Sequence, residues 1–558
     1  MQTPYELGNQ NQTTTWQACI EFYQALAQRF PGCLKFSEIG RSDTGLPLYA
    51  GVVSNDGVFD AAEVKRAGRP VFFNNNGIHP GEPEGIDACM ALVRDLCAAP
   101  QGLAALGSAV YLFIPVYNVD GCLNRNTTTR VNQDGPESFG FRGNGLHLDL
   151  NRDFIKCDSL NAQHFNRFFT AWDPDVMVDT HTSNGADYAY TMTLINTQAD
   201  KLGGGLGAFL RETMVPAIYH AMDEKGWPTC PYVNSLQTSP DGGIADFLET
   251  PRYSTGYAAL HHTIGFMPET HMLKPFADRY ASMRALLDVT LQFTLAHGAQ
   301  IQSLRQAAKA AARQKKHWPI SWKIDESKPS SVNFKGYEAV YSLSLLGDYQ
   351  RLSYDKTQPW ERSIANYTHF AEDVVVAAPR AYALPQAWRA VAERLTWNGV
   401  QMERLSEARS VTAQVYRIKS VQSRTIPYEG HMFHDDLVLE SHTETVELQI
   451  GDYWIPLDQD SARYIVETLE PLAHDSFFRW GFFNSILEKK ERYSDYVFED
   501  MALQLLQAEP ALKAKFENWK AENPALLKNQ RQVLSFIFEN CARFAEPSWR
   551  RYPVAAIF

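Results

Sequence analysis

The sequence lacks several features that would indicate other classes of protein. Its 558 residues include eight cysteines but no CxxC pair, which argues against a disulfide-dense scaffold or a structural zinc ribbon and leaves room for one or two disulfides. No apolar run is long enough to span a bilayer. The net charge of −12 argues against nucleic acid as the main partner, because phosphate binding needs clustered Lys and Arg. There is also no convincing GxSxG motif and no phosphate-binding GxxxxGKS or GxxxxGKT motif.

The composition is that of a folded globular protein. Apolar residues make up 45% of the chain and charged residues 21%, so extensive disorder is not expected. The length predicts two large domains or three to four of average size. The opening residues, MQTPYELGNQNQTTTW, contain no basic segment followed by an apolar stretch, so we expect no signal peptide in this chain.

Strand and helix patterns alternate through the first half of the sequence. Short apolar strands are expected at residues 71–75, 109–118, 175–181 and 264–271, and the segment that follows residue 84 has apolar residues at helical spacing. A long helix is expected from residue 276 onward. This alternation predicts an α/β layered domain with a mostly parallel sheet.

The composition and periodicity of the sequence change near residues 300–330, where a charged helical stretch is followed by the Pro/Ser-rich DESKPSS. We therefore predict an N-terminal α/β domain over residues 1–315, called the catalytic domain below for the site residues that it contains, and an accessory region over residues 316–558. The accessory region is expected to be β-rich to about residue 457 and helical after that. Its sequence predicts no function of its own beyond packing on the catalytic domain, shaping the cleft or binding a partner.

Four candidate metal-site residues follow or end the predicted strands. His79 and Glu82 lie in NNNGIHPGEPEG after the first strand, His181 ends the third, and Glu269 lies near the end of the fourth. Ligands of open α/β sheets bind at the carboxyl ends of the strands, so these residues would meet at one edge of the sheet. Each has a structural alternative: a turn residue, a helix N-terminal carboxylate, a core histidine and a helix cap. A His₂Glu set leaves the fourth position of zinc open, which is the catalytic arrangement.

The ordered motifs HPGE, NVDG, FRGNGLHLDLNRDF, DTH and ETH resemble those of the zinc carboxypeptidases of the carboxypeptidase A class. The resemblance covers roughly residues 1–300. It implies an α/β/α sandwich around a mixed, mostly parallel sheet. It also implies one zinc ion with His79, Glu82 and His181 as ligands.

Further roles are implied by the same resemblance. Asp149 matches the carboxylate that hydrogen-bonds the first histidine, which fixes the imidazole tautomer. Asn151 and Arg152 match the pair that holds the terminal carboxylate of the substrate, for which an arginine fork is suited. Arg142, nine residues before Asn151, matches the arginine that polarises the scissile carbonyl in several subfamilies, and Arg130 is the second choice.

The implied reaction is the hydrolysis of C-terminal peptide bonds by a metal-activated water, with Glu269 as general base. The implied partner is a peptide with a free C-terminal carboxylate. The resemblance also implies a periplasmic or secreted location, and a cytoplasmic one stays open. The preferred terminal residue and the oligomeric state do not follow from the sequence.

The sequence departs from the family pattern at several points. Gly81 stands where the animal digestive enzymes often carry an arginine, and Val119 replaces the usual proline of NPDG. ETH replaces the commoner glutamate-leucine, and neither Tyr253 nor Tyr257 has the spacing of the family's substrate-capping tyrosine. These differences concern specificity and leave the ligand set intact.

Two alternatives to a carboxypeptidase are compatible with these residues. One is a zinc amidohydrolase of acylated amino acids or cell-wall peptides, which uses the same ligand set. The other is a binding module without catalysis, although no ligand and no base is lost. A second group of metal-compatible residues, His431, His434 and Asp435 of HMFHDD, lies between two alternating segments and is interpreted as part of a hairpin loop.

Overall fold

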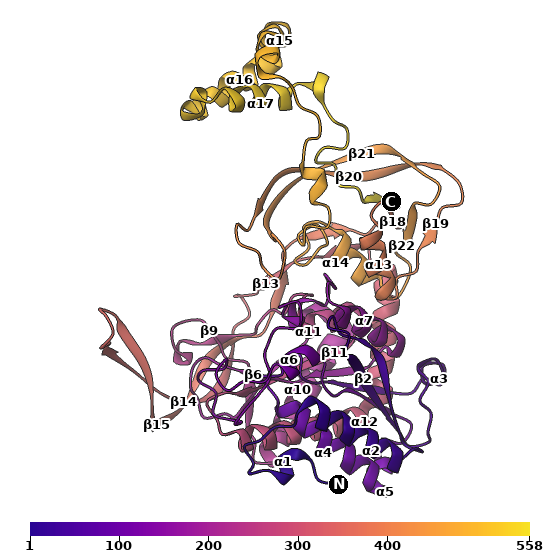
Figure 1. Ribbon diagram of the computed structural model, residues 1–558, viewed down its shortest axis with the longest axis vertical. Helices are drawn as coiled ribbons and strands as arrows, with labels where there is room; N and C mark the ends of the chain where they lie inside the picture. Colours follow the sequence, from indigo (N-terminus) through magenta and orange to yellow (C-terminus); the bar gives the residue numbers. More distant parts are fainter.

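The computed structural model describes residues 1–558. The N-terminal region forms the layered α/β body at the bottom of Figure 1, and most of the accessory region lies above it, with one ribbon to its left. Two parts of the accessory region extend away from this body: a long two-stranded ribbon and a group of three helices near the C-terminal end (Figure 1). The site described below lies in the α/β body, at its border with the accessory region.

A nine-stranded mixed sheet forms the centre of the N-terminal region, in the order β1-β2-β4-β3-β5-β11-β7-β8 with β6 beside β11. The central strands β4, β3, β5 and β11 run parallel, while β1, β2 and β7 join them in antiparallel pairs. The strands are β1 (Leu34–Arg41), β2 (Pro47–Ser54), β3 (Val71–Asn75), β4 (Val110–Ile114), β5 (Val176–Asp179), β6 (His181–Ser183), β7 (Met192–Asn196), β8 (Thr229–Pro231) and β11 (Ile264–His271).

Helices cover both faces of this sheet, as the α/β/α prediction requires. One face packs against a core cluster drawn from α2 (Trp16–Arg29), α4 (Glu84–Ala98), α9 (Gly204–Phe209), α10 (Val215–Glu224) and α12 (Phe276–Gln314). The apolar residues at helical spacing in α4 are all buried, which confirms that prediction. The sheet prediction is confirmed as a mixed sheet.

The other face packs against α7 (Leu160–Trp172), α11 (Ser254–Leu260) and the accessory region. Phe165 and Tyr257 belong to the same core cluster as Trp318 and Tyr464, so this core contains residues from both sides of the predicted boundary at 315 and 316. The accessory region thus buries one face of the catalytic sheet and its helices rather than standing apart from them.

The accessory region is β-rich first and helical afterwards, as expected. A six-stranded sheet has the order β19-β22-β18-β23-β20-β21, and the ribbon β14–β15 joins β10 and β9 in a four-stranded sheet. Of these strands, β9 (Asn234–Ser235) and β10 (Ile244–Ala245) belong to the N-terminal region. The main elements of the accessory region are β14 (Ser330–Leu343), β15 (Gln350–Tyr367), β18 (Ala381–Leu384), α13 (Arg389–Trp397), β19 (Glu403–Arg404), β20 (Arg409–Ser423), β21 (His434–Leu448), β22 (Tyr453–Pro456), α14 (Ala462–Leu469), α15 (Asp495–Ala508), α16 (Pro510–Glu522), α17 (Gln530–Asn540) and β23 (Ala555–Ile557).

Some local expectations need correction and others hold. The strand expected at 109–118 ends at Ile114, because Pro115 has no N–H to continue the ladder. The strand expected at 175–181 is broken at Thr180 into β5 and β6. HMFHDD does lie at the hairpin connection of β20 and β21, with His434 already in the strand. All eight cysteines are free. No single helix is both long and apolar enough to cross a membrane.

Candidate active site

The chain brings the predicted ligands together at the carboxyl ends of the central strands. After β3, the Glu82 N–H donates to the His79 carbonyl (2.8 Å), and this turn leads into α4. His181 begins β6 and is paired in register with Glu269 of β11. Glu82 is tied to β6 by a hydrogen bond that its Oε2 accepts from Thr182 N–H (2.8 Å). Sequence-distant loops and strands therefore present their side chains to one space.

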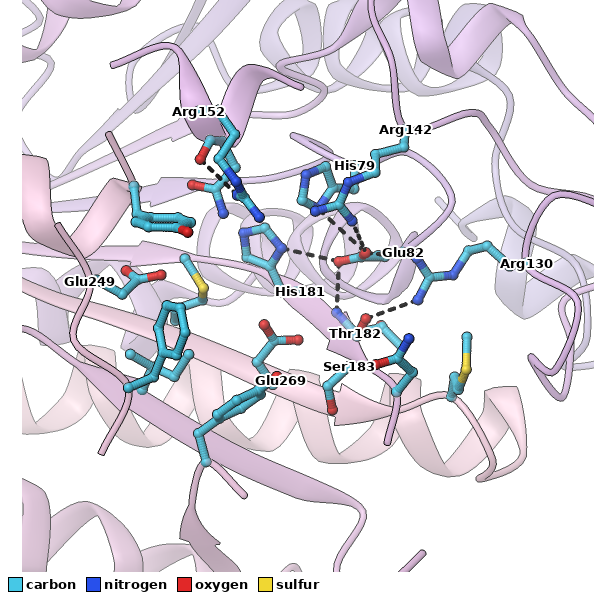
Figure 2. A pocket seen from close by; sticks show the side chains of 18 of the residues that line it. His79, Glu82, Arg130, Arg142, Arg152, His181, Thr182, Ser183, Glu249 and Glu269 are labelled. Carbon is cyan, nitrogen blue, oxygen red and sulfur yellow. Dashed lines mark hydrogen bonds and ion pairs between the residues drawn. The ribbon is translucent and has the colours of Figure 1, made fainter. Parts of the chain in front are cut away.

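His79, Glu82 and His181 offer ligand atoms that all lie within 4.8 Å of one another, and all three residues are buried. The Nδ1 atoms of His79 and His181 lie 3.3 and 3.0 Å from the two oxygens of Glu82 (Figure 2). His79 Nδ1 has no hydrogen-bond partner despite its burial. Two imidazoles, one carboxylate and an orphaned ring nitrogen fit a zinc ion.

Each histidine has a carboxylate behind it. His79 Nε2 lies 2.8 Å from Asp149 Oδ1, and His181 Nε2 lies 3.0 Å from Asp179 Oδ2. A proton on Nε2 that is donated to these carboxylates leaves the Nδ1 lone pair free for a metal. Asp149 has the contact expected from the sequence, whereas Asp179 was not predicted.

The charges of the site reinforce one another. Burial raises the pKa of Glu82, but Arg130, His79 and His181 outweigh it and hold this pKa well below its ordinary value. Burial is likewise outweighed at Asp149, whose pKa His79 and Arg142 hold well below the usual range. At His181 burial lowers the pKa, but Asp179 and Glu82 raise it well above the ordinary value in the metal-free protein. The site is thus built to hold a positive charge between carboxylates.

Both candidate arginines reach the site (Figure 2). Arg142 Nε donates to Asp149 Oδ2 (2.8 Å), and its Nη1 lies 3.4 Å from Glu82 Oε1. Arg130 Nη1 donates to the same Glu82 oxygen (2.7 Å), while its Nη2 donates to the Thr182 carbonyl (2.9 Å). Arg142 is 45% exposed against 15% for Arg130, so Arg142 has the freer guanidinium.

Asn151 and Arg152 lie in a short 3₁₀ turn that Asp149 caps, since its side chain accepts from Asn151 N–H (2.8 Å). Asn151 Oδ1 accepts from Ser254 N–H (3.2 Å). The Arg152 guanidinium lies 4.4 Å from the centre of the Tyr253 ring. These contacts hold an amide and a fixed positive charge on one wall of the cavity.

One cavity of about 490 Å³ contains the metal-site residues, Arg142, Asn151, Arg152 and Glu269. Glu269 is half-buried, and its Oε2 atom is buried and has no hydrogen-bond partner. Burial raises the pKa of Glu269 to about 8. A carboxylate of raised pKa without a fixed partner, next to a metal set, is suited to accept and return a proton.

Sequence reasoning missed two carboxylates of this site. Asp179 could have been found, because residues two apart in a strand face the same side and Asp179 precedes His181 by two. Glu249 lines the cavity and accepts hydrogen bonds from the backbone and hydroxyl of Thr255. Burial raises the pKa of Glu249 to about 7. No motif around Glu249 points to the site.

This combination of a His₂Glu set with a carboxylate held free beside it belongs to metal-dependent hydrolases. Residues 19–190 match the family model described as zinc carboxypeptidase. Carboxypeptidase 2 of Trichophyton rubrum is 22% identical over 424 residues, which cover 73% of this chain and 72% of that protein. Carboxypeptidase 2 of Trichophyton equinum is 21% identical over 425 residues, with the same shares covered. The crystal structure of a metallo-carboxypeptidase from Burkholderia cenocepacia has a TM-score of 0.39 and 14% identity over 52% of this chain and 70% of that chain.

Residues 19–190 thus carry a zinc carboxypeptidase domain. This domain and the named relatives support a metallocarboxypeptidase, and the matched family implies zinc as the metal for the His79, Glu82 and His181 cluster.

Proposed function

We propose that this protein removes C-terminal residues from peptides, with one zinc ion held by His79, Glu82 and His181 and with Glu269 as general base. The observation that carries the proposal is the unpartnered Oε2 of Glu269. It lies in the same cavity as the three ligands and the two candidate carboxylate-binding residues. A purely structural glutamate would have a hydrogen-bond partner at such burial.

Zinc bound at this set would lower the pKa of a water molecule to about 7 and polarise a carbonyl oxygen. Asp149 and Asp179 keep the two imidazoles in the tautomer that offers Nδ1 to the ion. Glu82 stays ionised because Arg130 and the two histidines stabilise its charge. These contacts support the ligand assignment without any further residue.

Glu269 accepts a proton from the attacking water and returns it to the nitrogen of the leaving amine. The positive charge of Arg142 faces the same cavity and can donate hydrogen bonds to the oxygen on which negative charge develops. Arg130 lies on the other side of Glu82 and is the second choice for this role. Arg130 donates hydrogen bonds to both Glu82 and the Thr182 carbonyl, which favours a role in fixing Glu82 as a metal ligand.

The proposed substrate is a peptide with a free C-terminal carboxylate. Arg152 can bind that carboxylate with two parallel N–H donors, and Asn151 can add an amide N–H. Tyr253 limits the movement of the Arg152 guanidinium by stacking on it. The periplasmic or secreted location stays a prediction. The alternative substrates, acylated amino acids and cell-wall peptides, are not favoured by the family match or by the named relatives.

The test is mass spectrometry of a mixed peptide pool after incubation with the zinc-loaded protein, with and without a chelator. We expect ladders that shorten from the C-terminus and disappear with chelator. Peptides with an amidated C-terminus serve as the matched control, because they lack the carboxylate that Arg152 would bind. Cleavage of free and amidated peptides at equal rates would contradict the proposed substrate, and an unchanged pool would contradict the activity.

A further inference from the structure

The accessory region contributes a loop to the catalytic site. Residues 424–433, the accessory loop, connect β20 to β21. Pro427, Glu429 and Gly430 of this loop line a second cavity of about 560 Å³. His79 and Arg142 line both this cavity and the one that holds Glu269, so the two cavities adjoin at the metal site. A region with no assigned function thus forms part of the wall behind a predicted zinc ligand.

One side chain of the accessory loop bonds directly to the catalytic machinery. Glu429 Oε2 accepts a hydrogen bond from the backbone N–H of Asp149 (2.8 Å). Asp149 in turn contacts His79 and Arg142 and caps the turn that contains Asn151. A single carboxylate from the accessory region therefore fixes the backbone of the segment on which a metal ligand, an arginine and the substrate-binding turn depend.

The backbone at Glu429 is unfavourable for a glutamate. Its φ is +50°, in the left-handed region that glycine adopts readily and that other residues adopt at a cost in free energy. The next residue, Gly430, has a φ of +82°. A glycine at position 429 would suit this backbone better, so the conformation gives no reason for a glutamate there. The hydrogen bond from Asp149 N–H to the Glu429 carboxylate does give a reason for a glutamate.

Contacts on both sides of Glu429 fix the position of the accessory loop and therefore of the Glu429 carboxylate. Tyr428 and His431 exchange two backbone hydrogen bonds of 2.8 and 3.0 Å across Glu429 and Gly430. His431 Nε2 lies 2.7 Å from Asp158 Oδ2 of the N-terminal region. The Tyr428 ring stacks on Trp480, with their centres 6.0 Å apart. The loop is therefore anchored on both sides of the residue that reaches the site.

We infer that Glu429 is a positioning residue of the hydrolytic site, acting through Asp149 on His79 and on the substrate-binding turn. The inference rests on the proposed function for the roles of these residues. Loss of the Glu429 oxygen leaves a buried Asp149 N–H without a partner and frees the segment to shift. A small displacement of Asp149 moves His79 and the substrate-binding turn, which weakens both metal binding and turnover.

The test compares Glu429→Gly with Glu429→Gln. Glycine relieves the left-handed backbone and removes the acceptor, whereas glutamine keeps an oxygen that can accept from Asp149 N–H. We expect Glu429→Gly to lower kcat/KM about tenfold and to weaken zinc binding, with a Tm equal to or above that of the wild type. Glu429→Gln should stay within about threefold of the wild type. Glu440→Gln, an exposed carboxylate of β21, is the matched control.

Wild-type kcat/KM in Glu429→Gly would overturn the inference, and so would a loss that appears only together with a lowered Tm. If Glu429→Gly does not fold, Glu429→Asn replaces it, because asparagine tolerates this backbone and is too short to reach Asp149.

Two further measurements do not depend on hydrolysis: zinc competition with a chromophoric chelator, and hydrogen exchange of the Asp149 amide. Faster exchange and weaker zinc binding in Glu429→Gly would support the positioning role even if wild-type protein cleaves no peptide, an outcome that would contradict the proposed function alone. Unchanged exchange would overturn the role.

Discussion

The two halves of the catalytic cavity are supported differently. The metal half, His79, Glu82 and His181, is bordered by Asp179 and Thr182 of neighbouring strands and is buried within the N-terminal region. The substrate half consists of Asn151, Arg152 and Tyr253. Asp149 and Ser254 of the N-terminal region bond to Asn151, and the accessory region contacts the residues that flank this half. The difference indicates that the central sheet supplies most of the metal geometry, with Glu429 adding support through Asp149, while the substrate-binding wall has more contacts with the second half of the chain.

The support of the substrate half is specific. Arg252, next to Tyr253, donates from its backbone N–H and its Nε to Asp475 (2.9 and 2.7 Å). Arg394 of α13 donates to the backbone carbonyl of Lys156, just after the substrate-binding turn. Buried charged contacts of this kind constrain geometry more than they add stability. Substitutions should therefore separate into those that change zinc binding and those that change substrate binding.

The largest effect is expected where the halves meet. Glu269→Gln removes the proton acceptor and should lower kcat by about 10²–10⁴-fold, with a zinc content equal to that of the wild type. The measurement is steady-state kinetics with metal analysis of the same samples. Glu440→Gln is the control. Turnover within threefold of the wild type would show that another group moves the proton.

The next effect tests the metal half. Asp179→Asn removes the carboxylate behind His181 and should lower zinc affinity by about 10–100-fold, measured by chelator competition. Asp149→Asn should do the same for His79 and should also raise KM, because Asp149 caps the substrate-binding turn. An Asp179→Asn variant with normal zinc affinity and raised KM would break the proposed division between the halves.

A smaller effect should be confined to the substrate half. Arg152→Lys keeps the positive charge but loses the two-donor fork, so KM should rise about tenfold, equivalent to about 1.4 kcal/mol. Zinc affinity should not change. Peptide kinetics and chelator competition measure the two quantities, and Arg167→Lys, at an exposed position of α7, serves as control. A fall in zinc affinity would mean that the halves are coupled through Arg152.

The smallest expected effect is a change of protonation. Since Asp179 and Glu82 raise the pKa of His181 well above its ordinary value, the metal-free protein keeps the second proton of this imidazole to a higher pH than a free histidine does. Zinc must displace it, so zinc affinity should fall as pH falls, and about one proton should be released on binding. Calorimetry in buffers of different ionisation enthalpy measures the release. In Asp179→Asn fewer protons should be released, and equal heats in all buffers would contradict the expectation.

Much of the catalytic half could be predicted from the sequence. The strand ends placed His79, Glu82, His181 and Glu269 at one edge of the sheet, because parallel strands and their loops share that edge. Asp149 could be assigned only by resemblance, and the structure places it against His79 as the resemblance implies. The alternating segments of the second half indicated strands, but alternation does not specify partners. It could not reveal that the ribbon β14–β15 pairs with β10.

The residues that were missed belong to long-range contacts. Glu249 lines the cavity because of the conformation of the loop that contains it. Glu429 contacts Asp149, which is 280 residues away in the sequence. Neither position has a composition or spacing that distinguishes it from a surface carboxylate. Such contacts depend on the packing of two regions, which local pattern does not describe.

The contact between Arg252 and Asp475 also has a consequence for biosynthesis. Its two residues are 223 positions apart, so the wall that receives the substrate cannot form until most of the chain has left the ribosome. In the nascent chain, this support of the substrate-binding wall is therefore among the last contacts of the site that can form.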